Sequence, residues 1–259
     1  RHDVVSSANK EVFSMQPMEQ RVQAYWTKRV RDFSTVRRNE LHNSALGQRW
    51  LAELRPYLPK DGPLDILDVG TGTGYFAILL SAAGHRLTGI DLTPAMIAEA
   101  ETTAAAMGVS ARFAVMDAMH TTFPDASFDV IVTRNLTWTL PDTPQAYREW
   151  RRLLRPNGVL LNFDANYGDN VRHHRQRDSY VPATEVYGHC GITPELEQEN
   201  AAITLAMPIS RQTRPQWDME LLPRCGFARC RYDRDAGRRV LGDLDLADAP
   251  LFFIAAYAE

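Results

Sequence analysis

The chain has 259 residues, of which 44% are hydrophobic and 24% are charged, with a formal net charge of −3. This ordinary globular composition, slightly acidic, argues against binding to nucleic acid through bulk positive charge. The sequence contains no apolar run of the ~18 residues that a membrane span needs, and no apolar signal core near its first residue. We therefore expect a cytoplasmic protein without a nucleic-acid or membrane partner.

The cysteines carry information about metal binding and redox compartment. Cys190, Cys225 and Cys230 are an odd number, and they lack the paired spacing of a zinc site or a disulfide framework. We expect no bound metal and a reducing environment.

Residues 1–60 carry a helical pattern. Apolar residues recur at near-helical spacing over Gln20–Arg38, with Arg and Lys between them, and the pattern continues over Leu41–Leu58, where prolines end it. This segment has no strand pattern. We expect a helical cap ahead of the core.

Residues 61–165 alternate between strands and helices, which is typical of a parallel, doubly wound sheet. The segment is predicted to be a nucleotide-binding core. The predicted strands cover 64–70, 85–91, 111–118, 127–135 and 158–165, and the predicted helices cover 76–83, 93–107 and 144–154.

The alternation stops over 166–215, which is polar and rich in His, Arg and Tyr. We interpret this segment as a helical lid inserted over the carboxyl edge of the sheet. Residues 216–259 then predict a final helix and two antiparallel strands. The whole chain, 1–259, is predicted to be one α/β domain with a Rossmann-like, doubly wound, seven-stranded, mostly parallel sheet.

The strongest local signal is the run Asp68-Val-Gly70-Thr-Gly72-Thr-Gly74, which follows the first predicted strand and opens a helix. Glycines allow a tight turn and close approach of a ligand, and a helix N-terminus offers unpaired N–H groups. A dinucleotide fingerprint needs a glycine where Tyr75 stands. The carboxylate of Asp68 would repel a pyrophosphate and attract a cationic amino group.

Polar side chains also end the next three predicted strands. Asp91 ends the second strand and can accept from both hydroxyls of a ribose. Asp117 ends the third strand, where it suits an adenine edge, and Asn135 ends the fourth. Because the carboxyl ends of parallel strands meet at one edge, these residues are expected to line one crevice. The alternative is that the acids only cap helices.

These segments together resemble the class I S-adenosylmethionine-dependent methyltransferases over about residues 45–165. The resemblance lies in the runs 64–100, 116–135 and 148–163. It implies S-adenosylmethionine as the methyl donor. The implied donor contacts are Asp68 near the ammonium group, Gly70, Gly72 and Gly74 along the methionine part, Asp91 on the ribose, Leu92 and Met96 beside the adenosine, Asp117 on the adenine amino group, Ala118 at the ring edge, and Asn135 near the sulfonium. One departure is Met119-His120, where the family often has an acid followed by Leu-Pro.

The resemblance implies methyl transfer by in-line displacement, which needs a general base only if the acceptor must lose a proton. The catalytic residues are therefore not identified; the candidates are Tyr25, His173 and His174. The histidine pair also fits a solvated basic helix face, or a recognition patch for an acidic acceptor. The run Asn135-Leu-Thr-Trp138 departs from the motif of nucleic-acid amine methylators, which favours a small-molecule acceptor.

Three alternatives stay open. The protein could methylate another protein, act as a nicotinamide-dependent oxidoreductase on a similar sheet, or bind a nucleotide without catalysis. Tyr75 and Asp68 weigh against the oxidoreductase. The oligomeric state is not determined by the sequence.

Overall fold

A computed structural model describes residues 17–59, 62–176 and 191–259. Within these ranges a seven-stranded sheet has the order β3-β2-β1-β4-β5-β7-β6. Strands β1 to β5 are parallel, and β7 is antiparallel to both of its neighbours. The strands are β1 (Asp65–Val69), β2 (Arg86–Asp91), β3 (Ala111–Val115), β4 (Phe128–Arg134), β5 (Leu154–Asp164), β6 (Arg229–Asp233) and β7 (Phe252–Tyr257). The predicted mostly parallel sheet is confirmed.

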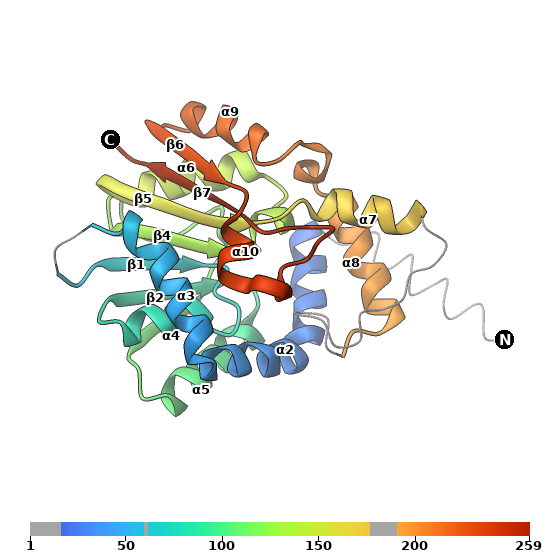
Figure 1. Cartoon of the computed structure of the whole chain (residues 1–259), viewed down its shortest axis with the longest axis horizontal. Helices are drawn as coiled ribbons and strands as arrows, with labels where there is room; N and C mark the ends of the chain where they lie inside the picture. Colours follow the sequence, from blue (N-terminus) through green and yellow to red (C-terminus); the bar gives the residue numbers. More distant parts are fainter. Residues whose placement is uncertain (1–16, 60–61, 177–190) are drawn as a thin grey trace.

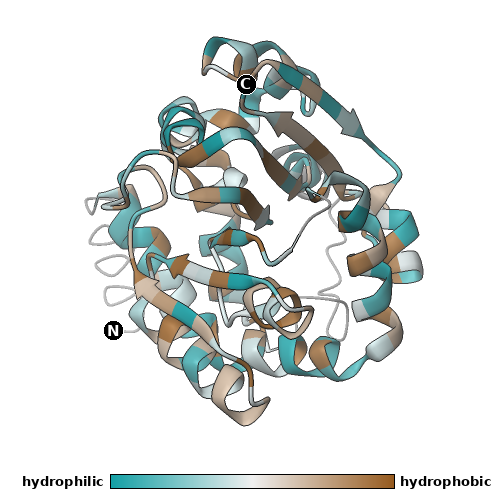
Figure 2. Ribbon diagram, turned by 90° about the vertical axis from the view of Figure 1, so that its left-hand side faces the viewer, coloured by the Kyte–Doolittle hydropathy of each residue, from teal (hydrophilic) through white to brown (hydrophobic). Residues whose placement is uncertain are grey.

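Helices cover both faces of this sheet, which explains why the central strands are apolar runs. Two separate clusters of buried residues mark the two faces. Figure 2 shows the hydrophobic colouring concentrated on the central strands. One face is covered by α3 (Ser44–Leu54), α4 (Tyr75–Ala82) and α10 (Ala236–Leu241). The other face is covered by α6 (Thr143–Leu153) and α9 (Gln216–Arg224). Helix α5 (Pro94–Ala106) packs beside β2 and β3.

A third cluster of buried residues lies beyond the carboxyl ends of the strands. It joins α2 (Met18–His42) to α8 (Pro194–Ala206) and to the short helix η3 (Pro208–Arg211). In Figure 1 the parallel strands point toward α2, which crosses their ends with α8 and α7 (Tyr167–Gln176) beside it. Arg21 and Glu199 connect α2 to α8 through two hydrogen bonds of 2.6 and 2.9 Å.

The buried residues of α2 include charged ones, namely Arg29, Arg37 and Glu40. Arg29 and Arg37 line a cavity at the strand ends, which α2 covers. Among the described residues, no helix is both long and apolar enough to cross a membrane.

Two predicted boundaries were wrong, and one helix was missed. The helix over 41–58 is interrupted, because α3 starts anew at Ser44 with the Asn43 side chain accepting from the backbone N–H of Leu46 at 3.1 Å. Strand β5 begins at Leu154, four residues earlier than predicted, through a bulged pairing with β4. The helix α10 was not predicted, since one short turn rich in arginine carries little periodic signal.

Trp50 is a central element of the first core. It is fully buried, and its ring meets Phe76 and Phe163 edge-on, with centroids 4.9 and 5.0 Å apart. Replacing it with alanine removes both aromatic contacts and leaves a cavity.

We expect Trp50→Ala to lower the free energy of unfolding by about 3–5 kcal/mol, measured by urea denaturation. Met107→Ala, at an exposed apolar position, is the control and should change it by less than about 0.5 kcal/mol. Similar values for the two variants would contradict this account of the core.

Candidate ligand-binding site

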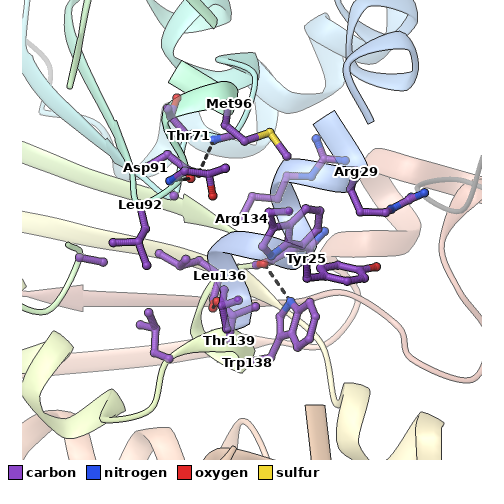
Figure 3. A pocket seen from close by; sticks show the side chains of 18 of the residues that line it. Tyr25, Arg29, Thr71, Asp91, Leu92, Met96, Arg134, Leu136, Trp138 and Thr139 are labelled. Atoms are coloured by element: carbon purple, nitrogen blue, oxygen red, sulfur yellow. Dashed lines mark hydrogen bonds between the residues drawn. The ribbon is translucent and has the colours of Figure 1, made fainter. Parts of the chain in front are cut away.

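A cavity of about 220 Å³ opens at the carboxyl edge of the sheet. Its walls come from the ends of β1 to β4, from α2 and α7, and from the region around α8. Figure 3 shows Thr71, Asp91, Leu92 and Met96 gathered on one side and Tyr25, Leu136 and Trp138 on the other. Most of the sequence-predicted residues line this cavity, namely Tyr25, Asp68, Gly70, Gly72, Asp91, Leu92, Met96, Asp117, Ala118 and Asn135.

Asp68 is buried at the end of β1 and connects the glycine turn to α4. Its Oδ2 accepts from the Thr71 hydroxyl at 2.6 Å and from the backbone N–H of Ala77 at 3.0 Å. Burial raises the pKa of Asp68 to about 7, although these two hydrogen bonds oppose the shift. The carboxylate therefore already occupies the N-terminal turn of α4.

Asp91 ends β2 and holds the same turn from the other side. Its Oδ2 accepts from the backbone N–H of Gly72 at 3.0 Å, and its Oδ1 accepts from the backbone N–H of Thr93 at 2.8 Å. Burial raises the pKa of Asp91. Each oxygen has a further lone pair for a ligand hydroxyl. Asp91 therefore stabilises the turn and can also accept hydrogen bonds from a ligand.

Asp117 follows β3 in a more exposed position. Its Oδ1 accepts from the backbone N–H of Met119 at 2.8 Å, and its Oδ2 lies 3.0 Å from the His120 Nδ1. The carbonyl of Ala118 accepts from the indole N–H of Trp150 at 2.9 Å. The backbone at this wall is therefore anchored to α6.

The glycines of the turn have different neighbours. Gly70 and Gly72 line the cavity with left-handed backbones, at φ of 66° and 54°. Gly74, at φ 90°, lies outside the cavity wall, and a Cβ there would meet Ala100 of α5 at 3.1 Å. Gly74 thus permits close packing of α4 against α5.

Asn135 sits directly after β4 in a left-handed conformation with φ 57°, which is strained for a non-glycine residue. Three hydrogen bonds hold it. Its backbone N–H donates to the Phe163 carbonyl at 2.8 Å, and its carbonyl accepts from the Trp138 indole N–H at 2.9 Å. Its amide Oδ1 accepts from the Tyr167 hydroxyl at 3.0 Å. Trp138 and Tyr167 also line the cavity.

A buried ionic network supports this wall from behind. Arg214 donates to Asp164 at 2.8 Å and to Asp218 at 2.9 and 3.0 Å. It also donates to the Thr137 hydroxyl at 2.9 Å, and that hydroxyl donates to Asp164. Tyr147 adds a hydroxyl bond of 2.5 Å to Asp218. All of these residues are buried, so the segment after β4 is held by groups from β5, α6 and α9.

A second charged cluster lines the cavity near the glycine turn. Glu40 accepts from Arg37 at 2.7 Å and from two nitrogens of Arg134 at 3.3 Å. Sequence analysis missed both arginines. Arg134 ends β4 immediately before Asn135, and that position was the one available signal.

The candidate catalytic residues are in different places. Tyr25 is buried in the cavity wall, and burial raises its pKa to about 12, so its hydroxyl is neutral at pH 7. His173 is exposed on α7 and is not among the residues that line the cavity. His174 belongs to α7, but its side chain lies outside the described residues.

Within the part of the chain that the structure describes, no group of three or more His, Cys, Asp or Glu side chains is arranged to hold a metal ion. The cavity polar groups are instead carboxylates, guanidiniums and amides. Apolar residues such as Ile90, Leu92 and Met96 separate them. This combination suits an organic ligand that carries a ring, hydroxyl groups and charged ends.

Comparison with known proteins gives a family for the core. Residues 67–162 match the family model described as methyltransferase domain. The chain is 34% identical over 125 residues to demethylmenaquinone methyltransferase of Thermus thermophilus, covering 48% of this chain and 57% of that protein. It is 30% identical over 169 residues to 27-O-demethylrifamycin SV methyltransferase of Amycolatopsis mediterranei, covering 59% of each. The chain therefore spans little more than half the length of these relatives.

Solved structures share the fold at lower identity. PH0226 protein from Pyrococcus horikoshii has a TM-score of 0.56 at 17% identity, covering 82% of this chain and 91% of that one. Phosphoethanolamine N-methyltransferase 2 of Haemonchus contortus has a TM-score of 0.57 at 18% identity, covering 82% of this chain and 52% of that one. These likenesses concern the fold alone.

The ionic network behind Asn135 yields a stability prediction. We expect Arg214→Leu to lower the free energy of unfolding by about 3–5 kcal/mol at pH 7, because Asp164 and Asp218 would remain buried without their cation.

Urea denaturation at pH 7 measures this effect. Arg211→Leu, at an exposed position three residues away, is the matched control and should cost less than about 0.5 kcal/mol. A loss for Arg214→Leu as small as that of the control would contradict the ionic account.

Proposed function

From the premise that residues 67–162 belong to the methyltransferase domain family, we propose that this protein is a class I methyltransferase. It would transfer a methyl group from S-adenosylmethionine to a small-molecule acceptor. The proposal concerns the whole chain, whereas the family match covers its central part.

The observation that carries the proposal is the position of Asp68. A dinucleotide site on such a sheet places a pyrophosphate at the N-terminus of the first helix. Here the carboxylate of Asp68 already accepts from the N–H of Ala77 in that turn. An anion would be repelled there and an ammonium group attracted, which favours the donor over a nicotinamide cofactor.

The residues of the cavity suit a donor that has a flat nucleoside at one end and a charged amino-acid group at the other. Asp68 would hold its ammonium group, while Gly70 and Gly72 would lie along its methionine part. Asp91 would accept from the ribose hydroxyls. The other proposed contacts are Leu92, Met96, Asp117, Ala118 and Asn135, whereas Gly74 would shape the turn without lining the cavity. When bound, the donor supplies a methyl group on a sulfonium, which is already activated for displacement.

The chain itself has to align the acceptor and exclude water. The wall opposite the glycine turn is aromatic and aliphatic, with Tyr25, Trp138 and Tyr167 beside polar amides. The relatives' names specify acceptors such as demethylmenaquinone and 27-O-demethylrifamycin SV. We propose a small, largely apolar acceptor here as well.

A strong general base is not part of the proposal. None of the described residues that line the cavity is a histidine, and Tyr25 is a poor base at neutral pH because of its raised pKa. We therefore propose that the acceptor is already nucleophilic, or is acidic enough to ionise in the site.

The organisation of the chain completes the proposal. Residues 1–60 would act as a cap and 166–215 as a lid on one domain that spans 1–259. We further propose a cytoplasmic location without a nucleic-acid or membrane partner, in line with free thiols at Cys225 and Cys230.

Thermal unfolding tests the donor. S-adenosylmethionine or S-adenosylhomocysteine at ~100 times the dissociation constant should add ~2.7 kcal/mol of stability, a rise of roughly 5–10 °C in Tm. NAD should give no rise. A rise with NAD alone would overturn the proposal in favour of an oxidoreductase.

The raised pKa of Asp68 predicts how donor affinity depends on pH. An ammonium group needs the ionised carboxylate, so binding below about pH 7 must first release the proton of Asp68. We expect S-adenosylhomocysteine to bind roughly tenfold more weakly at pH 6 than at pH 8, measured by titration calorimetry.

Two controls isolate the effect. 5′-Methylthioadenosine lacks the amino-acid end and should bind equally at both pH values. Asp68→Asn should reduce the affinity for S-adenosylhomocysteine and remove its pH dependence. Equal pH dependence for the two ligands would contradict the placement of Asp68 at the ammonium group.

A further inference from the structure

The amide of Asn135 lies where two walls of the cavity meet. The next residue, Leu136, packs against the glycine turn, since a Cβ on Gly70 would be 2.7 Å from its side chain. On the other side the amide contacts Tyr167, the first residue of α7. Asn135 is half-buried, and all four residues line the cavity. A ligand beside the glycine turn and a second ligand against the opposite wall would therefore meet at this amide.

The hydroxyl of Tyr167 determines which end of the amide faces the cavity. Within the described residues its one hydrogen bond is to the Asn135 Oδ1, at 3.0 Å. Burial raises the pKa of Tyr167, so the hydroxyl keeps its single proton at neutral pH and donates it to this oxygen. If the amide were turned around, the hydroxyl would accept from Nδ2, and its own proton would lose its acceptor.

The Nδ2 atom of Asn135 is left for a ligand. It makes no hydrogen bond with any residue that the structure describes, and it is not among the buried polar atoms that lack a partner. Since Asn135 lines the cavity, this N–H group faces the space in which a ligand would lie. The wall therefore presents a hydrogen-bond donor at this point, with its acceptor oxygen already engaged.

Two aromatic rings frame this donor. The rings of Trp138 and Tyr167 have centroids 5.2 Å apart, with 56° between their planes, and both line the cavity. The indole N–H of Trp138 donates to the Asn135 carbonyl at 2.9 Å, which fixes the ring beside the amide. A ligand that fits here combines a flat apolar body with an atom that accepts a hydrogen bond.

The chemistry of an amide N–H separates classes of methyl acceptor. A neutral amine needs its lone pair for the displacement and offers only N–H groups to the wall, which Nδ2 cannot accept. A hydroxyl oxygen has lone pairs to spare, and its ionised form accepts a stronger hydrogen bond than its neutral form. An acidic hydroxyl also needs no general base, in line with the absence of histidine among the described residues that line the cavity.

We propose that Asn135 determines the class of acceptor by donating from Nδ2 to the ionised hydroxyl oxygen of a planar phenol or enol. Tyr167 is the positioning residue that keeps the amide in this orientation. The inference rests on the proposed function and deepens it, since it names the substrate class and the atom that recognises it.

The test uses 4-nitrophenol, whose own pKa lies near neutrality and whose visible absorption reports the phenolate. S-adenosylhomocysteine is present at saturation, so that the probe enters the part of the cavity outside the donor site. The wild-type protein should bind the phenolate roughly tenfold more tightly than the neutral phenol, which lowers the apparent pKa of the bound probe by about 1. The amine of the same shape, 4-nitroaniline, should bind more weakly than the phenolate.

Tyr167→Phe tests the positioning role. This variant keeps the ring but removes the hydroxyl that holds Oδ1, so the amide can turn and present its oxygen to the cavity. We expect the affinity for the phenolate to fall severalfold and the affinity for 4-nitroaniline to rise. A purely structural effect of the substitution would weaken both probes together.

Asn135→Gly tests the donor itself. Glycine suits the left-handed backbone at φ 57°, and the substitution removes the amide without adding a charge. The preference for the phenolate should disappear, although Arg134 remains beside the site, and this variant provides the test if Tyr167→Phe does not fold. Tyr232→Phe, which removes a hydroxyl from a residue that is 43% exposed on β6, is the control and should bind both probes as the wild type does.

Three results would overturn the inference. These are a wild-type protein that does not prefer the phenolate or does not bind it, equal weakening of both probes by Tyr167→Phe, or a preference that survives in Asn135→Gly. If S-adenosylhomocysteine itself does not bind the wild-type protein, the proposed function fails. If it binds and the preference is absent, only the assignment of the acceptor fails.

Discussion

This cavity depends on one constraint. A backbone N–H group that is buried where a strand ends needs a hydrogen-bond acceptor. At the ends of β1, β2, β3 and β5 a carboxylate is the acceptor. Asp68, Asp91, Asp117 and Asp164 each accept from at least one backbone N–H within or near the following turn. The acids shape the turns before they can serve any ligand.

This arrangement explains the electrostatics of the cavity beside the glycine turn. Carboxylates held by the backbone cannot swing into water, so they remain buried and the pKa values of Asp68 and Asp91 rise. A buried carboxylate with a raised pKa gains most from a cationic ligand. The buried arginines of α2 and β4 pair with Glu40 nearby.

The wall opposite the glycine turn is built by a different kind of contact. Asn135 is held in a strained conformation by Trp138 and Tyr167, and the turn that carries Trp138 is held by Asp164 and Arg214. The members of this network come from segments far apart in the chain.

The sequence by itself determined the sheet, the order of strands and helices in the core, and the turn that follows β1. These features depend on neighbours in the chain: apolar runs form buried strands, glycines permit left-handed backbone, and acids at strand ends pair with nearby N–H groups. The same local rule explains why ten of the predicted site residues line one cavity.

Only the tertiary structure decided which face of α2 is buried, and which arginines belong to the site. Arg37 and Arg134 are 97 residues apart, and Arg214 reaches Asp164 across 50 residues. In the sequence Arg134 is an ordinary strand end, and Arg214 fits a pocket residue and a surface charge equally well, until the fold places a carboxylate beside each. Buried charges pair with partners that are distant in the sequence. The spacing of residues along the chain does not predict such partners.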